Sequence, residues 1–291
     1  MTEVLLTNDD GIDADGLAAL YEELRAVGDV TVVAPTENQS GVGRDRSSYV
    51  TREDHPWGYA LEGTPADCVA YGLRGLDADF DLVVSGCNHG PNLGAYVLGR
   101  SGTVGAAMEA AFLGTSAVAV SAYHTREFFV HPPDDHDFSP PARVARELVE
   151  GVLAEEVFAE ADVVNVNAPI EDADARVRLT RPDVDFDLDV ERHEDTADLP
   201  VDVADDQDVI GLNDSLWPHV TGWENPMPGI DEHRERYPVG TERRAVIDGE
   251  VGVSGLTAPR TALETDALER VVADVDGASR SLADEDRDDD E

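Results

Sequence analysis

The sequence contains no lysine, so all 21 of its basic residues are arginines, whereas 63 residues are acidic. The formal net charge at pH 7 is therefore −42. A chain this acidic repels itself at low ionic strength and needs salt to screen its charges. This balance predicts adaptation to a high-salt cytoplasm. The same charge repels phosphate backbones, so we expect no nucleic acid as a bulk partner.

Cysteines and long apolar runs are also scarce. The only two cysteines, Cys68 and Cys87, have apolar neighbours, which favours buried thiols over a disulfide or a zinc site. No apolar run reaches the 18 residues of a membrane span, and no basic region precedes an apolar stretch at the N-terminus. We expect a cytoplasmic protein without a membrane segment. Because 41% of the residues are hydrophobic, an acidic disordered chain is excluded.

The most informative stretch lies at the start of the chain. An apolar run over residues 4–7 predicts a short buried strand, and Asn8, Asp9, Asp10 and Gly11 follow it directly. In an open parallel sheet, ligands bind just beyond the carboxyl ends of the strands. Two adjacent carboxylates repel each other there unless a positive charge lies between them, and a hard divalent cation supplies it. The alternative is an ordinary turn, which the same residue types favour.

A calcium-binding EF-hand loop is a second alternative for this region. With Gly11 in the first position, Asp13, Asp15 and Glu22 occupy the third, fifth and twelfth positions of the loop template. However, the first position calls for a carboxylate, and the segment before it has the pattern of a strand instead of a helix. The pattern therefore favours the strand-end site over an EF-hand.

Strands and amphipathic helices alternate over the first 170 residues, which is typical of an α/β fold with a mostly parallel sheet. Thr64, Pro65 and Asp67 form a helix start, with a capping residue, a proline in the first turn and an acidic residue near the positive end of the helix. Strands are predicted over residues 4–7, 30–34, 80–84, 116–121 and 163–166, and helices over 16–26, 105–113 and 139–158.

Two further strand ends and one helix start are expected at the edge where Asp9 lies. Ser40 and Gly41 follow the second strand, and Asn88 follows the third. Residues 101–103, Ser-Gly-Thr, open a buried helix whose free amides and hydroxyls suit an anion. Oxygen ligands beside a phosphate-sized anion site indicate Mg²⁺, Mn²⁺ or Ca²⁺ and phosphoryl chemistry. His89 has no carboxylate beside it and is expected to be a solvent-facing loop residue.

Beyond residue 180 the periodic pattern weakens. We expect the catalytic core to span residues 1–180 and a divergent acidic extension, a candidate oligomerisation arm, to span 181–250. Residues 251–280 have the pattern of a strand and a helix that return to the core. Residues 281–291 are expected to be a disordered acidic tail.

Five motifs make the sequence between residues 3 and 170 resemble the SurE family of stationary-phase survival proteins, which are metal-dependent 5′/3′-nucleotidases. A weaker match returns near residues 252–259. The motifs are Thr7–Ile12, Val33–Pro35 with Asn38–Gly41, Gly63–Val69, Val84–Gly94 and Ser101–Ala107.

The resemblance implies a Rossmann-like three-layer α/β/α core with a C-terminal extension that exchanges between subunits, and hence a homodimer or homotetramer. It also implies one divalent cation per subunit, Mg²⁺ or Mn²⁺. The family's metal ligands fall on Asp9, Asp10, Ser40 and Asn88 of this sequence, the residues that the strand ends also select.

The implied reaction is hydrolysis of a nucleoside 5′-monophosphate, with 3′-monophosphates as a further substrate class, to nucleoside and phosphate. Asp9, Asp10 and Asn8 would be catalytic, with Asn8 or Asp9 orienting the attacking water. The phosphate oxygens would be held by Gly41, Asn92, Ser101, Gly102 and Thr103.

The stretch between Asn92 and Ser101 departs from the family pattern. Tyr96 stands where the family has an aspartate, and Arg100 replaces an aromatic residue or histidine. Arg100 could contact phosphate or pair with a surface acid, and both readings stay open. The alternatives to a nucleotidase are an exopolyphosphatase-type enzyme and a catalytically silent protein that binds metal and phosphate.

Overall fold

The computed structural model describes residues 2–125, 136–155, 157–193, 208–215, 230–258 and 265–273. Its contacts divide the chain into two units, residues 1–258 and 259–291. In the second unit, residues 266–273 are helical, and the Thr265 hydroxyl accepts a hydrogen bond from the Leu268 amide at 3.2 Å. The expected tail over residues 281–291 lies outside the described residues.

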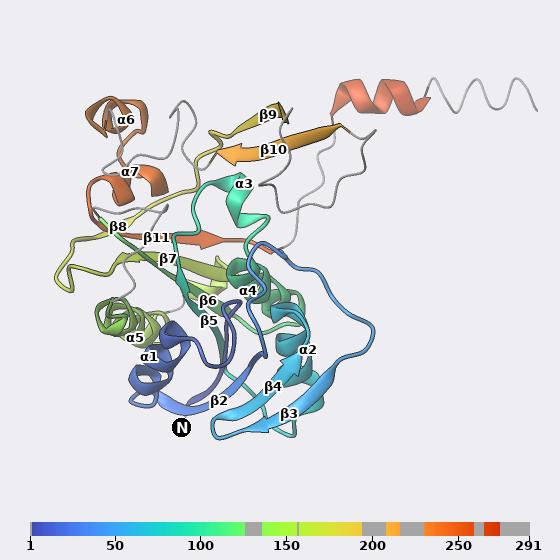
Figure 1. Cartoon of the computed structure of the whole chain (residues 1–291), viewed down its shortest axis with the longest axis vertical. Helices are drawn as coiled ribbons and strands as arrows, with labels where there is room; N and C mark the ends of the chain where they lie inside the picture. The colour runs from blue at the N-terminus through green and yellow to red at the C-terminus, as the bar shows by residue number, and fades with distance from the viewer. Residues whose placement is uncertain are drawn as a thin grey trace, which may run out of the picture. The chain divides into compact units, whose positions relative to one another are not determined.

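A nine-stranded sheet forms the centre of the first unit, in the order β3-β4-β2-β1-β5-β6-β7-β11-β8 (Figure 1). The six strands from β4 to β7 in this order are mutually parallel, β3 is antiparallel to β4, and β11 is antiparallel to β7. The strands are β1 Thr2–Thr7, β2 Gly28–Pro35, β3 Thr51–His55, β4 Gly58–Glu62, β5 Leu82–His89, β6 Ala117–Tyr123, β7 Val163–Pro169, β8 Val177–Leu179 and β11 Val251–Leu256.

Helices cover both faces of this sheet. Helices α1 and α5 pack together on one face and α2 and α4 on the other (Figure 1). This confirms the α/β fold that the sequence predicts and the three-layer arrangement that the family resemblance implies. The helices are α1 Asp15–Leu24, α2 Pro65–Gly75, α3 Ala95–Leu98, α4 Gly102–Phe112, α5 Ser139–Ala154, the 3₁₀ turn η1 Val157–Ala159, α6 Ile230–Arg236 and α7 Glu242–Ile247.

The central strands are buried on both faces, as expected for a parallel sheet covered by helices. Side chains of β1 and β5 alternate between two apolar clusters, one under α1 and α5 and the other under α2 and α4. Both cysteines lie in these clusters as free, buried thiols, as the sequence indicates. Burial raises the pKa of both thiols.

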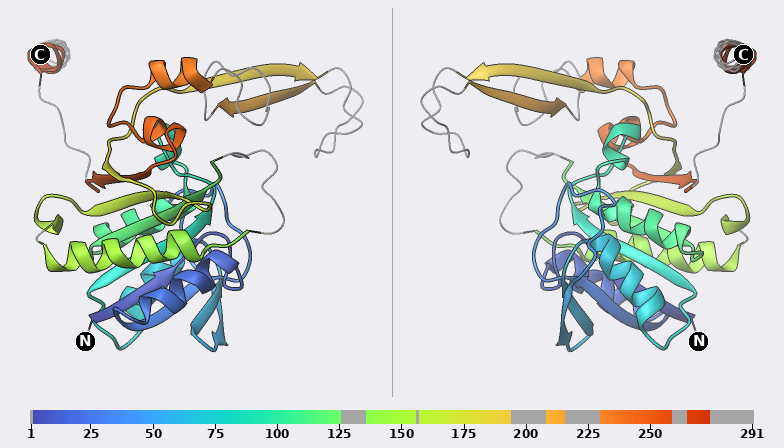
Figure 2. Two further views of the ribbon diagram at one scale, coloured as in Figure 1. Left: turned by 90° about the vertical axis from the view of Figure 1, so that its left-hand side faces the viewer. Right: turned by 90° about the vertical axis from the view of Figure 1, so that its right-hand side faces the viewer.

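The segment between β8 and β11 contains a hairpin and two short helices (Figure 2). Strands β9 Asp187–His193 and β10 Val209–Ser215 pair only with each other among the described strands. By contrast, Tyr237, Val246 and Ile247 pack against Leu93 and Tyr123 of the core. The extension therefore includes segments that pack on the sheet, because its apolar residues near α6 and α7 cover the end of β6. No helix among the described residues is long and apolar enough to cross a membrane.

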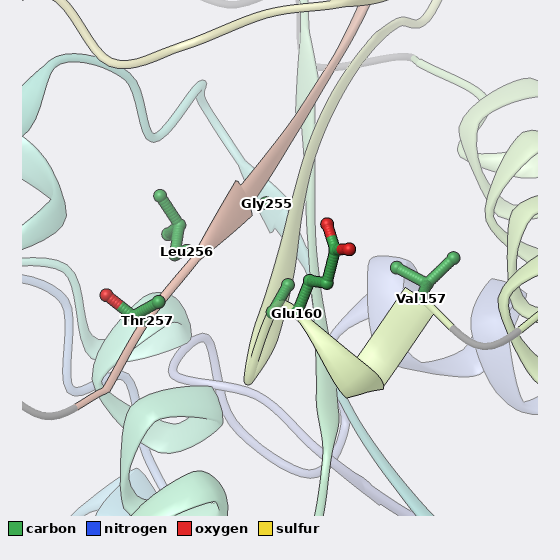
Figure 3. A pocket seen from close by; sticks show the side chains of 6 residues that line it. Val157, Glu160, Gly255, Leu256 and Thr257 are labelled. Atoms are coloured by element: carbon green, nitrogen blue, oxygen red, sulfur yellow. The ribbon is translucent and has the colours of Figure 1, made fainter.

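A pocket of about 390 Å³ lies beside the end of β11 (Figure 3). Leu256 pairs with Val163, the first residue of β7. The pocket is therefore at the amino end of the parallel strands, away from the edge where the polar motifs converge. Its lining residues are Val157, Glu160, Ala161, Gly255, Leu256 and Thr257.

Candidate metal and phosphate site

The loops after β1, β2 and β5 meet at the carboxyl edge of the sheet, because these three strands are neighbours. Asp9 and Asp10 follow β1, and the loop that contains Ser40 follows β2. The backbone joins the two loops, since the Gln39 amide donates to the Asp9 carbonyl oxygen at 2.6 Å. Asn88 is the penultimate residue of β5. The structure thus brings together the four predicted metal-binding positions.

Asp9 lies at the N-terminus of α4 and is only 3% exposed. The Thr103 hydroxyl donates to its Oδ1 atom at 2.6 Å, and the backbone amides of Gly102 and Thr103 also donate to the carboxylate. Burial raises the pKa of Asp9, and these donors, together with the backbone amide of Asp9 itself, oppose the rise. A side chain at position 102 would clash, because a Cβ atom there would lie 2.7 Å from Asp9 Oδ2.

Asp10 is partly buried and contacts both neighbouring loops. Its Oδ2 accepts from the His89 amide at 3.2 Å and its Oδ1 accepts from Asn38 Nδ2 at 3.3 Å. Burial, together with the adjacent charge of Asp9, raises the pKa of Asp10 to about 6. The surroundings of both residues thus disfavour the charged carboxylate, and a bound cation would stabilise it.

Ser40 and Asn88 carry neutral side-chain oxygens and lie close in sequence to Asn38 and His89, the two residues that contact Asp10. The Ser40 amide donates to Asn38 Oδ1 at 2.8 Å, and the Ser40 side chain is exposed. Asn88 Nδ2 donates a hydrogen bond to the Gly90 carbonyl oxygen at 2.5 Å. This bond fixes the orientation of the side-chain amide, so that its oxygen can serve as a cation ligand. Among the described residues, no group of three or more His, Cys, Asp or Glu side chains could hold a metal ion. Two carboxylates with neutral oxygens fit a hard cation such as Mg²⁺ or Mn²⁺.

Three of the predicted phosphate contacts, Asn92, Ser101 and Thr103, already have hydrogen-bond partners near Asp9. The Ser101 hydroxyl caps α4 by accepting from the Val104 amide at 3.1 Å. Asn92 Nδ2 donates to Ser121 Oγ at 2.9 Å and to Thr103 Oγ1 at 3.3 Å. The anion at the start of α4 is therefore the Asp9 carboxylate in this structure.

Gly41 and Asn8 lie in the turns beside the carboxylates. Gly41 has φ +79°, and a Cβ atom placed on it would meet nothing within 4 Å. Asn8 Nδ2 donates to the Gly11 carbonyl oxygen at 2.8 Å and shapes the turn after β1. The buried Asn8 Oδ1 has no hydrogen-bond partner among the described residues.

The expectation that His89 faces solvent in a loop is wrong, because His89 is half-buried and ends β5. Its Nε2 lies 2.9 Å from Nε2 of His124, and His124 Nδ1 lies 3.4 Å from a Glu171 carboxylate oxygen. The ring centroids of His136 and His89 are 4.3 Å apart. Burial, then the charges of His136 and His124, lowers the pKa of His89 to about 4. Separations of 35 residues and more conceal these neighbours in the sequence.

Arg100 and Tyr96, the two departures from the motif, contact each other. Arg100 Nη1 donates to the Tyr96 hydroxyl at 2.8 Å. The Tyr96 ring stacks on Phe186, with ring centroids 3.4 Å apart. The Arg100 carbonyl oxygen accepts from the Gly43 amide at 3.0 Å, which joins this stretch to the loop after β2.

The EF-hand alternative does not fit the structure. Strand β1 leads into Gly11, so no helix enters the loop. The Asp13 side chain is 92% exposed and lies 3.8 Å from His55. Gly16 packs against β5, because a Cβ atom there would lie 2.1 Å from the Cys87 carbonyl oxygen.

Comparison with known proteins gives consistent results. Residues 4–185 match the family model described as survival protein SurE. The 5′-nucleotidase SurE of Natronomonas pharaonis is 47% identical over 264 residues, which cover 88% of this chain and 93% of the relative. That of Halobacterium salinarum is 47% identical over 274 residues, 94% of this chain and 97% of the relative. The crystal structure of the SurE protein from Aquifex aeolicus matches with a TM-score of 0.68 and 31% identity, over 89% of this chain and 94% of that one.

Proposed function

The chain belongs to the SurE family, and from this premise we propose that it is a metal-dependent 5′-nucleotidase that hydrolyses nucleoside monophosphates to nucleoside and phosphate. The observation that supports this most directly is the pair of adjacent carboxylates, one buried and one partly buried, whose pKa values are both raised. Such a pair is costly without a cation. It lies at the start of a buried helix, where a phosphate also binds well.

Asp9, Asp10, Ser40 and Asn88 would hold one divalent cation, Mg²⁺ or Mn²⁺. A bound cation offsets the charge of a phosphate group and makes a water molecule more acidic. Thr103 favours the charged form of Asp9 by donating a hydrogen bond to it. His89 and Asn38 do the same for Asp10 through the bonds described above.

Gly41, Asn92, Ser101, Gly102 and Thr103 would bind the phosphate oxygens. The open space around Gly41 supports this assignment, because a ligand can approach its backbone closely. The amides at the start of α4 would be shared between the phosphate and Asp9. This arrangement keeps fixed donors near the place where negative charge develops in the transition state.

Asn8 and Asp9 would orient the attacking water, with Asp10 beside them. The position of Asn8 directly before Asp9, with its side chain shaping the turn after β1, supports this role. Asp9 is fixed by three donors and so presents its carboxylate in one orientation. A fixed acceptor lowers the entropic cost of placing the water in line with the leaving oxygen.

Phosphate release in molar salt tests this proposal. Purified protein is offered 5′- and 3′-nucleoside monophosphates and tripolyphosphate with Mg²⁺ or Mn²⁺, with a chelator as control. We expect chelator-sensitive release from the monophosphates, and a fall in kcat/KM of about 10²-fold or more in Asp10→Asn, since it removes a metal ligand. Asp13→Asn is the matched control, because it makes the same change at an exposed carboxylate in the same loop.

Two outcomes would overturn the proposal. Release from tripolyphosphate alone would indicate an exopolyphosphatase. Cation binding without release from any substrate would indicate a catalytically silent protein that binds metal and phosphate.

We also propose that the chain forms a homodimer or homotetramer in the cytoplasm. The β9–β10 hairpin supports this, because Leu188, Val190, Ile210 and Leu212 are exposed on it. Light scattering after gel filtration in molar salt measures the assembly, and a mass of one chain would contradict it.

A further inference from the structure

The loop that carries Asn92 is held by two asparagines of β7. The Asn167 side chain makes two hydrogen bonds to the Asn92 backbone. Its Oδ1 accepts from the Asn92 backbone N–H at 2.8 Å, and its Nδ2 donates to the Asn92 carbonyl oxygen at 2.9 Å. Asn165 Nδ2 donates to the same carbonyl oxygen at 3.0 Å. Both residues point to one face of β7, since they are two positions apart.

A third side chain reaches this loop from the extension. The Glu242 Oε2 atom accepts from the Gly94 amide at 2.7 Å, and its Oε1 accepts from Asn165 Nδ2 at 3.1 Å. Glu242 is the first residue of α7, and it is 1% exposed. Gly94 has φ +79°, and a Cβ atom there would lie 2.8 Å from the Arg243 guanidinium. The loop and α7 therefore pack without room for a side chain at position 94.

These three residues are unusual choices for a buried strand and helix. A carboxylate and two amides cost free energy when buried, and apolar residues of similar size often replace them without loss of stability. Asn165 lies between two buried valines, and its Oδ1 has no hydrogen-bond partner among the described residues. Packing alone does not explain why these polar side chains are buried here. Their hydrogen bonds to the Asn92–Gly94 loop do explain it, because they fix the orientation of that loop.

The contacts lead from these residues directly to the candidate site. The Asn92 side-chain Nδ2 donates to Thr103 Oγ1 at 3.3 Å, and the Thr103 hydroxyl donates to Asp9 Oδ1 at 2.6 Å. A displacement of the Asn92 backbone would therefore move its side-chain amide, whereas Thr103, in the first turn of α4, would keep its own hydrogen bond to Asp9.

We propose that Asn165, Asn167 and Glu242 are positioning residues that orient Asn92 toward the phosphate group of the substrate. This inference rests on the proposed function. Its consequence is that α7, which lies in the extension, completes the phosphate-binding part of the site. None of the three residues touches substrate, and each acts through the backbone of the Asn92–Gly94 loop.

Two variants test the inference, and inorganic phosphate is the probe. Glu242→Gln keeps the shape of the side chain, but it places an N–H group against the donors of Gly94 or Asn165. Asn167→Asp keeps the acceptor for the Asn92 amide and replaces the donor to its carbonyl oxygen. Glu109→Gln is the matched control, because Glu109 is also buried but pairs with Arg44 and Arg46.

Titration calorimetry in molar salt measures Mn²⁺ binding first and phosphate binding to the Mn²⁺ form second. We expect the Kd of phosphate, and the KM of a nucleoside monophosphate, to rise about tenfold or more in both variants, as for the loss of one hydrogen bond to the loop. The Kd of Mn²⁺ should stay within about twofold of the wild type, since the metal ligands keep their own partners. The control should leave both constants unchanged.

Phosphate affinity equal to the wild type in both variants would overturn the inference. So would an equal loss of Mn²⁺ and phosphate affinity, which would indicate a merely structural role, or a wild type that binds no phosphate. If the wild type binds Mn²⁺ and phosphate but hydrolyses no nucleotide, the proposed function fails, and the binding constants still decide the inference.

Discussion

Asp9 and Asp10 are neighbours in the sequence but have different surroundings. Asp9 is fully enclosed and receives three hydrogen bonds from the start of α4. Asp10 is less buried and receives its contacts from two loops. The pKa of each is raised by burial, and the pKa of Asp10 is raised further by the charge of Asp9. Two features of the pair therefore favour cation binding. Hydrogen bonds fix the orientation of the Asp9 carboxylate, and at Asp10 the cation would offset the repulsion from Asp9.

The Thr103 hydroxyl should matter for metal binding although it is not a proposed ligand. Thr103→Val removes the donor to Asp9 and keeps the shape of the side chain. A hydrogen bond to a charged group contributes about 1.5–3 kcal/mol, so we expect the Kd of Mn²⁺ to rise roughly 10- to 100-fold and the pKa of Asp9 to rise. Calorimetry measures the Kd. Thr103→Ser keeps the hydroxyl and should bind Mn²⁺ like the wild type, and equal losses in both variants would contradict the explanation.

Metal binding should depend on pH because Asp10 must lose its proton. The pKa of Asp10 in the metal-free fold is about 6, above its ordinary value of 3.8. Below pH 6 a proton competes with the cation, so we expect Mn²⁺ affinity to rise about tenfold per pH unit up to pH 6 and to level off above it. Calorimetry between pH 5 and 8 in constant molar salt checks this. Affinity that is flat below pH 6 would exclude this titration.

The same pKa shift changes the stability of the metal-free protein. Between about pH 4 and 6 the folded state binds more protons than the unfolded state, because the folded pKa of Asp10 is the higher one. The contribution of Asp10 to the free energy of unfolding of the metal-free protein therefore falls as the pH rises through that window. Bound Mn²⁺ should remove the effect, since it stabilises the charged carboxylate. Melting curves with and without Mn²⁺ at pH 4.5 and 6.5 compare the two states.

The sequence indicates the site residues that follow strands and conceals those that act over long separations. Asp9 and Asp10 could be predicted because an apolar run ends just before them. Asn88 is expected after the strand predicted over residues 80–84, but β5 continues through it to His89. Glu242 contacts Gly94 across 148 positions, and Asn165 contacts Asn92 across 73. Nothing in the local pattern around residue 242 links it to the site. Such contacts depend on how β7 and α7 pack beside the loop that carries Asn92.

At the scale of elements, α4 depends on close approach. Gly105 packs on the loop after β2, because a Cβ atom there would lie 2.2 Å from the Gly43 carbonyl oxygen and 2.6 Å from its carbon. That loop carries Ser40 and Gly41, whereas α4 carries Thr103. The distance between helix and loop therefore sets the distance between the proposed cation and phosphate contacts.

Gly105→Ala should push α4 and this loop apart. The added Cβ atom would meet the Gly43 carbonyl group, which is backbone and can move only at a cost in free energy. We therefore expect a loss of about 1–3 kcal/mol in the free energy of unfolding and weaker Mn²⁺ binding. Gly151→Ala in α5 is the matched control, since a Cβ atom there meets nothing within 4 Å. It should be neutral or stabilise by up to about 1 kcal/mol. Denaturant unfolding in molar salt distinguishes them, and equal effects would refute the packing argument.

The elements that could be predicted are those with local signals of their own. The expected start of α2 is confirmed in detail: the Thr64 hydroxyl accepts from the Asp67 amide, and the Asp67 carboxylate accepts from the Thr64 amide. Strand β3, Thr51–His55, has no apolar alternation because it is an exposed edge strand. Helices α6 and α7 are too short to show a helical stripe. Their placement depends on tertiary packing, which periodicity does not encode.

For the whole molecule, charge is the dominant property. The 63 acidic residues face 21 arginines, so at most about a third of the carboxylates can form one-to-one ion pairs. Several arginines do pair, as Arg146 does with Glu23 and Glu150 at 2.9 Å each. Pairs at the surface contribute about 0–1 kcal/mol each. The sum over all charges is therefore repulsive, and the relatives from Natronomonas pharaonis and Halobacterium salinarum are consistent with a protein adapted to high salt.

We expect the melting temperature to fall when the salt concentration is reduced from molar to millimolar. Salt weakens attraction and repulsion alike, but with a net charge of −42 the repulsion that it removes is larger. The screening length is about 10 Å at 0.1 M and 3 Å at 1 M, so screening should give most of its gain below about 1 M KCl. Stabilisation through exclusion of salt from the surface would instead continue to rise at higher concentrations.

Melting curves from about 0.05 to 3 M KCl distinguish these two causes by their shape. Curves at several concentrations of sucrose are the control, because an uncharged osmolyte strengthens burial without screening charge. A steep rise below 1 M that sucrose does not reproduce would assign the effect to charge. A melting temperature that is the same in molar and millimolar KCl would contradict the prediction, and it would mean that the carboxylates lie too far apart, or are too well hydrated, for their repulsion to destabilise the fold.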